Sequence, residues 1–209
     1  MRMIKNIIFD LGVVLLNIDF QRTTDAFYKL GITNINEIFS GYAQYEFFDA
    51  FEKGLISPQQ FRDEIKKFIP EPVTDNMIDE AWNVMILDFP VERINLLLNC
   101  RSKYRTFLLS NTNALHFLTY NKLLNEKYQI RDLSDLFERA YYSFRLGLRK
   151  PDIEIFELVL KENNLKPEET LFIDDFPQHI ETAASLGINT ILLKPPQTLT
   201  DVFHDAEVI

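Results

Sequence analysis

The chain has 209 residues, of which 46% are hydrophobic and 25% are charged, as in an ordinary globular protein of one domain or one domain with an insertion. The net charge of −9 argues against a general nucleic-acid binder, although a local positive pocket could still hold a small anion. No apolar run approaches the roughly 18 residues of a membrane span. The start of the chain lacks a signal-peptide pattern and the lone Cys100 excludes an intrachain disulfide, so we expect a cytoplasmic protein.

The first predicted element is a strand from Ile7 to Phe9 that ends at Asp10. Apolar residues on both of its faces are typical of a parallel sheet that helices cover on both sides. Ligands of such sheets bind beyond the carboxyl ends of the strands, where Asp10 would lie. Taken alone, however, Asp10 could equally cap the following turn.

Helical patterning dominates from there to about residue 104. We predict helices over 23–30, 37–53 and 75–86, and another that starts at Ser57-Pro58, where Ser caps the helix and Pro occupies its first turn. Three aromatic residues recur at helical spacing in the second of these helices: Phe47, Phe48 and Phe51. We expect them to fill the core of this segment rather than to form a wall of a substrate site.

From Pro90 onward, strands alternate with helices. The predicted strands are 106–110, 140–144, 171–175 and 190–193, and the predicted helices are 90–104, 114–128, 151–163 and 177–186. This alternation indicates an α/β fold with a doubly wound parallel sheet. We therefore expect a core of residues 1–16 and 91–209, interrupted by a helical insertion over 17–90.

Polar groups follow four of the predicted elements at or near the same edge of the sheet: Asp10, Ser110-Asn111, Lys150 and Asp174-Asp175. Three carboxylates at one edge raise each other's pKa, and Lys150 together with one Mg²⁺ would balance their charge. Asp10 could then attack phosphorus and form an aspartyl-phosphate. Taken singly, each of these groups has a simpler interpretation as a turn, a helix cap or a surface residue.

The other polar groups of the constellation suit the same chemistry. Ser110 and Asn111 could donate hydrogen bonds to phosphoryl oxygens, and Lys150 could neutralise the charge that develops on the transferring group. We expect a small phosphorylated metabolite as the partner. His179 follows the acidic pair and could approach the site, but we expect it on a helix surface. One of Arg145 and Arg149 could face substrate anions, but we expect both to be solvated.

Four stretches of the chain resemble, in order, the motifs of the haloacid dehalogenase (HAD) superfamily: Asp10-Leu11-Gly12-Val13-Val14, Leu108 to Asn113, Gly147 to Asp152, and Phe172-Ile173-Asp174-Asp175. The resemblance implies a Rossmann-like core, a mobile helical cap and, most often, phosphatase activity on small organic phosphates. It also implies that Mg²⁺ is held by the Asp10 side chain, the Gly12 carbonyl and Asp175, with Asp174 acting directly or through water.

Gly12 departs from the family pattern, because most family phosphatases carry an Asp there as general acid and base. The loss of a positioned acid commonly costs about 10²–10⁴-fold in rate. Water, Asp19 or Asp174 could substitute, the substrate could have a good leaving group, or turnover could be slow. The α-glucose-1-phosphate phosphatase-like branch of the family also has Asp-Leu-Gly in this motif, which favours a sugar phosphate.

Three alternatives to a phosphatase remain open at this stage. Two are other activities of the superfamily, a phosphomutase or a dehalogenase. The dehalogenase needs no metal, so Asp174 and Asp175 count against it. The third is a weakly catalytic protein that binds a metabolite or a partner, and Gly12 is the residue that supports it.

Overall fold

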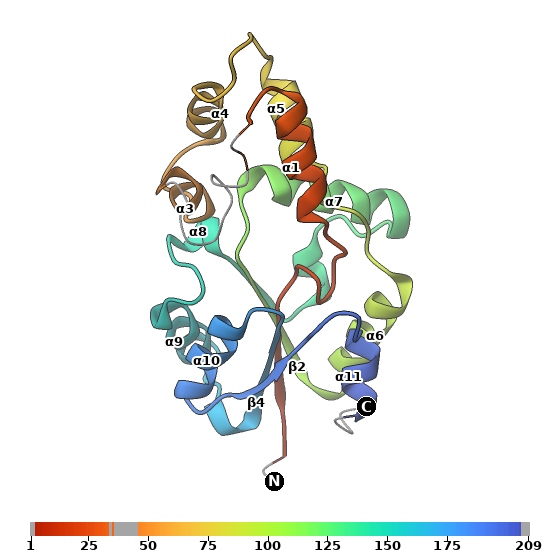
Figure 1. Ribbon diagram of the computed structural model, residues 1–209. Coiled ribbons are helices and arrows are strands. Elements are labelled where there is room, and N and C mark those ends of the chain that lie inside the picture. The colour runs from red at the N-terminus through yellow and green to blue at the C-terminus, as the bar shows by residue number, and fades with distance from the viewer. Residues whose placement is uncertain (1–2, 34, 36–45, 206–209) are drawn as a thin grey trace.

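A five-stranded parallel sheet forms the centre of the computed structural model, which describes residues 3–33, 35 and 46–205 (Figure 1). Its strands are β1 (Asn6–Phe9), β2 (Arg105–Ser110), β3 (Arg139–Tyr142), β4 (Thr170–Asp174) and β5 (Asn189–Leu192). They lie in the order β3-β2-β1-β4-β5, and all the pairs are parallel. With β1 at the centre and later strands added on both sides, the sheet is doubly wound, which confirms the predicted fold class.

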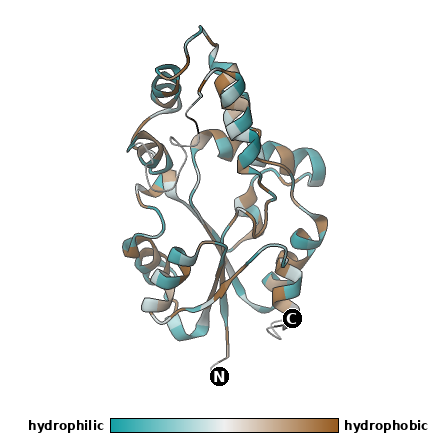
Figure 2. Cartoon of the chain, viewed as in Figure 1, coloured by the Kyte–Doolittle hydropathy of each residue, from teal (hydrophilic) through white to brown (hydrophobic). Residues whose placement is uncertain are grey.

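Helices cover both faces of the sheet. One core cluster contains residues of α6 (Val91–Lys103), α7 (Ala114–Tyr128) and α11 (Leu199–Asp205), and the other contains residues of α9 (Ile153–Glu162) and α10 (Pro177–Ser185). Ile7 and Phe9 of β1 belong to the first cluster and Ile8 to the second, because successive side chains of a strand point to opposite faces. Figure 2 shows the mixed hydropathy of these helices, as expected when only one side of each is buried.

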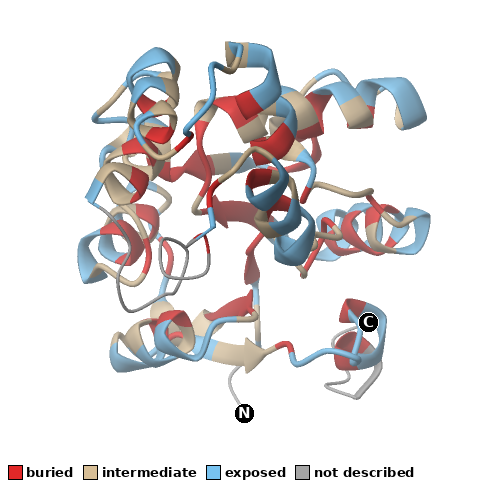
Figure 3. Cartoon of the chain, turned by 45° about the horizontal axis from the view of Figure 1, so that its top comes forward, coloured by how far each residue is buried: buried red, intermediate tan, exposed pale blue. Residues whose placement is uncertain are grey.

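Four helices lie together beyond the carboxyl ends of the strands, in the upper part of Figure 1: α1 (Phe20–Lys29), α3 (Glu46–Glu52), α4 (Pro58–Lys66) and α5 (Asp75–Asn83). We call them the cap helices. Their shared apolar cluster is rich in aromatic rings, such as Phe51 and Phe61 with centroids 4.2 Å apart. Phe47, Phe48 and Phe51 all pack in this cluster, as predicted, and Figure 3 shows buried residues along the cap helices.

The chain crosses twice between the sheet and the cap helices, and the two crossings pair with each other. The Asn17 N–H donates to the Asp88 carbonyl at 2.8 Å, and the Leu87 N–H donates to the Asn17 carbonyl at 3.0 Å. One residue further on, Ile18 forms an antiparallel bridge with Ile86. The crossings thus pair residues 17 and 18 with residues 86–88.

Several element boundaries differ from the sequence prediction. The predicted strand 140–144 ends at Tyr142, because residues Ser143–Leu146 form the short helix α8, which closes at Gly147 with φ +70°. Helix α1 begins at Phe20 rather than at residue 23, because the Asp19 side chain caps it by accepting from the Gln21 N–H.

Some elements were not predicted, and one prediction is only partly described. Helix α11 and the 3₁₀ turns Leu133–Leu136 and Pro167–Glu169 are new. Of the predicted helix 37–53, residues 37–45 lie outside the described residues. None of the helices in the described part of the chain has the length and apolar character needed to span a membrane.

Candidate active site

Asp10 and Asp174 lie next to each other because their strands are neighbours. Phe9 pairs with Ile173, and the Asp10 N–H extends this pairing by donating to the Ile173 carbonyl at 2.9 Å. Both carboxylates therefore emerge at the carboxyl end of the sheet, beside the central strand. In doubly wound sheets this is the usual place for a ligand.

Lys150 joins the two carboxylates. Its Nζ donates to Asp10 Oδ1 and to Asp174 Oδ2, both at 2.6 Å, and the side chain has no exposed surface. Burial alone would favour the neutral amine, but Asp10 and Asp174 together raise the pKa of Lys150 above its usual value. Lys150 is thus a buried cation between two acids, at the sheet edge where the sequence analysis expected its charge.

Asp175 completes a cluster of acids. The ligand oxygens of Asp10, Asp174 and Asp175 all lie within 4.8 Å of one another. Burial and the neighbouring carboxylates raise the pKa of Asp10 to about 7 and that of Asp175 to about 6. Burial also acts to raise the pKa of Asp174, but Lys150 and His179 outweigh it and hold this pKa at about 2.

The cluster suits a divalent cation. One lysine leaves three adjacent carboxylates incompletely neutralised, and their mutual repulsion adds to burial, the main cause of the raised pKa values of Asp10 and Asp175. Mg²⁺ prefers a few hard oxygen ligands of this kind and keeps room for water and phosphate. The Gly12 carbonyl, a further predicted ligand, accepts from the Val14 N–H at 2.5 Å and retains a second lone pair.

Asn111 holds the loop that carries the lysine. Its Oδ1 accepts from the Lys150 N–H at 2.9 Å, and its Nδ2 donates to the Lys150 carbonyl at 2.8 Å. The amide side chain is thus engaged with the protein. The neighbouring Ser110 is buried at the end of β2, and its Oγ donates to the Asn111 carbonyl over a long 3.4 Å. Both residues lie at the predicted edge of the sheet.

The predicted surface position of His179 is wrong. This side chain is buried, and its Nδ1 lies 3.0 Å from each oxygen of Asp174. Helix α10 begins three residues after β4 ends, so its first turn carries His179 back over the carboxylate. The five-residue spacing from Asp174 to His179 was the signal in the sequence that pointed to this contact.

The predicted solvation of Arg149 is also wrong. Its guanidinium contacts two acids of the cap helix α3, Asp49 at 2.8 Å and Glu52 at 3.1 Å. A second pair joins the same regions, with Lys53 Nζ 3.3 Å from an oxygen of Asp152. The loop that carries Lys150 is therefore attached to the cap. Only the fold could reveal these pairs, because about 100 residues separate the partners.

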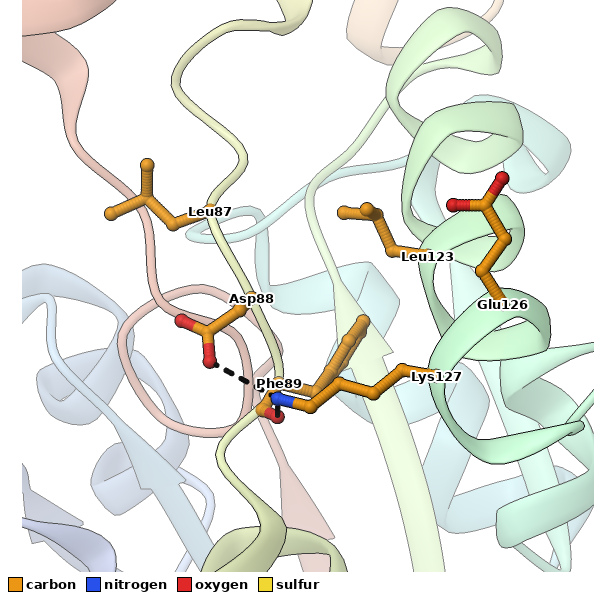
Figure 4. A pocket seen from close by; sticks show the side chains of 6 residues that line it. All are labelled: Leu87, Asp88, Phe89, Leu123, Glu126 and Lys127. Atoms are coloured by element: carbon orange, nitrogen blue, oxygen red, sulfur yellow. Dashed lines mark hydrogen bonds and ion pairs between the residues drawn. The ribbon is translucent and has the colours of Figure 1, made fainter.

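A separate hollow of about 220 Å³ lies at the return crossing, where residues 87–89 pass α7 (Figure 4). Lys127 Nζ donates there to the Phe89 carbonyl at 3.1 Å and to Asp88 at 3.5 Å. The Tyr128 hydroxyl donates to the same carbonyl at 2.6 Å. The residues that line the hollow include none of the acid cluster. We infer that the contacts of Lys127 and Tyr128 hold the return crossing against α7.

The known proteins that this chain resembles are hydrolases, and two of them are phosphatases. Residues 4–187 match the model of the haloacid dehalogenase-like hydrolases. The chain is 31% identical over 188 residues to D-ribitol-5-phosphate phosphatase of Bacteroides thetaiotaomicron, covering 90% of this chain and 91% of that protein. It is 26% identical over 188 residues to a sesquiterpene phosphatase of Aspergillus oryzae, covering 88% and 87%.

The structure also has a close counterpart among solved ones. A HAD family enzyme of Bacteroides thetaiotaomicron, solved in complex with magnesium and inorganic phosphate, superimposes with a TM-score of 0.85 at 38% identity. The match covers 96% of this chain and 99% of that one. It therefore includes the sheet and the cap helices together.

Proposed function

Because the chain belongs to the haloacid dehalogenase-like hydrolases, we propose that it is a Mg²⁺-dependent phosphatase that hydrolyses small organic phosphate monoesters, sugar phosphates among them. The observation that carries this proposal is the buried Lys150 between Asp10 and Asp174, with Asp175 beside them. The phosphatase names of two relatives support the class of reaction. The magnesium and phosphate in the similar enzyme support the cofactor and the substrate class.

Asp10 is the nucleophile in this proposal. One of its oxygens forms a bond to phosphorus while the bond from phosphorus to the ester oxygen breaks, which yields an aspartyl-phosphate. The electron pair stays on the ester oxygen, which takes a proton from water to become the alcohol. Water then attacks the phosphorus, and inorganic phosphate and the free Asp10 carboxylate result. Lys150 keeps Asp10 in place and offsets the negative charge of the phosphoryl group.

The remaining site residues bind metal and phosphate. Asp10, Asp175 and the Gly12 carbonyl would hold Mg²⁺, with Asp174 bound directly or through water. The bound ion supplies positive charge to the phosphoryl oxygens. Ser110 and the Asn111 backbone would donate hydrogen bonds to these oxygens, while the Asn111 side chain keeps the Lys150 loop in position.

Residues 17–90 form the helical cap in this proposal, and residues 1–16 and 91–209 form the core. The paired crossings and the separate aromatic cluster of the cap helices support this division. The cap would select the substrate, because it lies beyond the sheet edge that carries Asp10 (Figure 1). A cytoplasmic location, where phosphorylated metabolites occur, completes the proposal.

Hydrolysis of p-nitrophenyl phosphate tests this function. We expect turnover with Mg²⁺, loss of turnover with EDTA, recovery with excess Mg²⁺, and no turnover by Asp10→Asn. Asp88→Asn, at the return crossing, is the control for a changed aspartate outside the acid cluster. A folded protein that hydrolyses neither this ester nor any of a panel of sugar phosphates would favour the weakly catalytic binding protein instead.

Product analysis separates the proposed phosphatase from the other activities of the superfamily. A phosphomutase would return a phosphate ester with the group on another hydroxyl, whereas a phosphatase releases inorganic phosphate. A dehalogenase needs no metal and would have no use for the paired acids Asp174 and Asp175 beside the nucleophile. Release of phosphate in equal amount to the alcohol is the expected result.

A further inference from the structure

The turn after Asp10 is built around a residue in an unusual conformation. Val13 has a φ of +60°, in the left-handed region that β-branched residues rarely adopt. The Val14 N–H donates across it to the Gly12 carbonyl at 2.5 Å, which closes a three-residue γ-turn. A γ-turn with a positive φ at its centre is rare and strained, so contacts from elsewhere must hold this one in place.

This turn presents the Gly12 carbonyl, which the proposed function makes a ligand of Mg²⁺. A Cβ added to Gly12 would lie 4.0 Å from Asp10 Oδ2, so the turn lies beside the acid cluster. The carbonyl oxygen has two lone pairs, and the Val14 N–H occupies one of them. The second lone pair can face the ion only while the Val14 N–H keeps the carbonyl from turning.

Arg93 holds the opposite end of the peptide unit that carries the Val14 N–H. This arginine lies in the first turn of α6, directly after the return crossing, and its Nη1 donates to the Val13 carbonyl at 2.7 Å. The C=O of Val13 and the N–H of Val14 belong to one planar peptide unit and point in opposite directions. Anchoring the carbonyl therefore also fixes the direction of the N–H. The positive charge of the guanidinium polarises the unit and so strengthens the hydrogen bond that the N–H donates.

We propose that Arg93 is a positioning residue of the metal site, and that it acts on the Gly12 carbonyl through the peptide unit between Val13 and Val14. This inference rests on the proposed function, because it needs the Gly12 carbonyl to bind Mg²⁺. The two hydrogen bonds run in series, from the guanidinium to Val13 and from Val14 to Gly12. Residues that orient a metal ligand in this way contribute about 10–100-fold to metal affinity.

The affinity for Mg²⁺ separates this role from a simple effect of charge. Arg93→Met removes a positive charge beside the turn, which by electrostatics alone would strengthen the binding of a cation. The positioning role predicts the opposite sign, a dissociation constant for Mg²⁺ about 10–100-fold higher than in the wild type. A Mg²⁺ titration followed by thermal unfolding measures this constant, and the melting temperature without metal reports any structural loss separately.

Arg101→Met is the matched control, because Arg101 lies about two turns further along α6 and its Nη1 donates to the Asp135 carbonyl, also at 2.7 Å. This variant should leave the affinity for Mg²⁺ unchanged. Arg93→Lys keeps a positive charge and a donor, so it should recover most of the affinity that Arg93→Met loses.

Three outcomes would count against the inference. An affinity for Mg²⁺ in Arg93→Met that equals or exceeds that of the wild type would overturn it and leave the proposed function intact. An equal loss of affinity in the two methionine variants would overturn it as well, because the loss would then not depend on the turn. A wild type that binds no Mg²⁺ would contradict the proposed function, and the inference would fail with it.

Discussion

The ammonium group of Lys150 lies 2.6 Å from the Asp10 carboxylate, in a part of the molecule where the lysine has no contact with solvent. Asp174 receives a second hydrogen bond of the same length. A buried charge is costly unless partners compensate for it, and here each group depends on the others. The contacts that position Asp10 therefore also contribute to the free energy of unfolding.

Lys150→Met should destabilise the metal-free protein by about 3–5 kcal/mol near pH 7, because it leaves two buried carboxylates without their cation. Urea unfolding measures this loss. Lys5→Met is the matched control, since it removes a lysine whose 3.0 Å pair with Glu169 lies at the surface and should cost no more than about 1 kcal/mol. Equal losses for the two variants would show that the buried pairs contribute little.

The dependence of stability on pH should differ with and without Mg²⁺. The folded protein holds the pKa of Asp10 at about 7 and that of Asp175 at about 6, both above the usual 3.8. Between about pH 4 and 7 these two acids bind more protons in the folded than in the unfolded state, so their contribution to stability without metal falls as pH rises. Burial lowers the pKa of His116 to about 4 and also lowers that of His179, so these two side chains act in the opposite direction below about pH 6.5. The depressed pKa of Asp174 has the opposite effect, but only below about pH 4.

Bound Mg²⁺ would replace those protons, so it should raise the melting temperature more at pH 8 than at pH 5. Thermal unfolding with and without Mg²⁺ at the two pH values measures the effect. Asp175→Asn should reduce the gain at pH 8, because it removes one expected ligand. A gain that is larger at pH 5 would contradict both the pKa directions and the assignment of the metal to these acids.

The parts of the site that the sequence revealed are those fixed by local pattern. Asp10 and Asp174 end apolar strands, and parallel strands bring their carboxyl ends to one edge. The same pattern placed Lys150 near this edge, the family resemblance supported it, and the structure connects it to both acids. Most strands and helices of the core were also predicted correctly, because each has a local pattern of apolar residues in the sequence.

The parts that the sequence did not reveal depend on geometry between distant segments. Arg149 meets Asp49 only because the cap helix α3 folds back over the lysine loop. Ile18 fills the space beside Gly12 only because the two crossings pair, and neither residue carries a signal of this contact in its own sequence neighbourhood. Tertiary contacts of this kind need the fold before they can be predicted.

His179 should support the metal site through Asp174. Its ring contacts both oxygens of this carboxylate at 3.0 Å and so limits how the carboxylate can turn. His179→Ala should weaken Mg²⁺ binding about 10–100-fold, which is typical for a residue that orients a metal ligand. A Mg²⁺ titration followed by thermal unfolding measures this affinity. Gln178→Ala, at the exposed neighbouring position, is the control, and an equal effect of both would exclude a positioning role for His179.

Gly54 allows the end of α3 to touch the core, and a comparison with Gly147 can isolate this contact. Both have positive φ angles, +66° and +70°, so alanine strains the backbone at either position by about 1–2 kcal/mol. At Gly147 a Cβ would meet nothing within 4 Å, whereas at Gly54 it would overlap the carbonyl oxygen of Phe144. We therefore expect Gly54→Ala to cost about 1–3 kcal/mol more than Gly147→Ala in urea unfolding.

Hydrogen exchange provides the second measurement for this pair of variants. Relief of the overlap at Gly54 requires α3 to move away from α8, which would also lengthen the contact between Asp49 and Arg149. Amides of Glu46–Glu52 should then exchange faster in Gly54→Ala than in Gly147→Ala. Equal unfolding energies and equal exchange in the two variants would show that the approach of Gly54 to Phe144 does not hold the cap against the core.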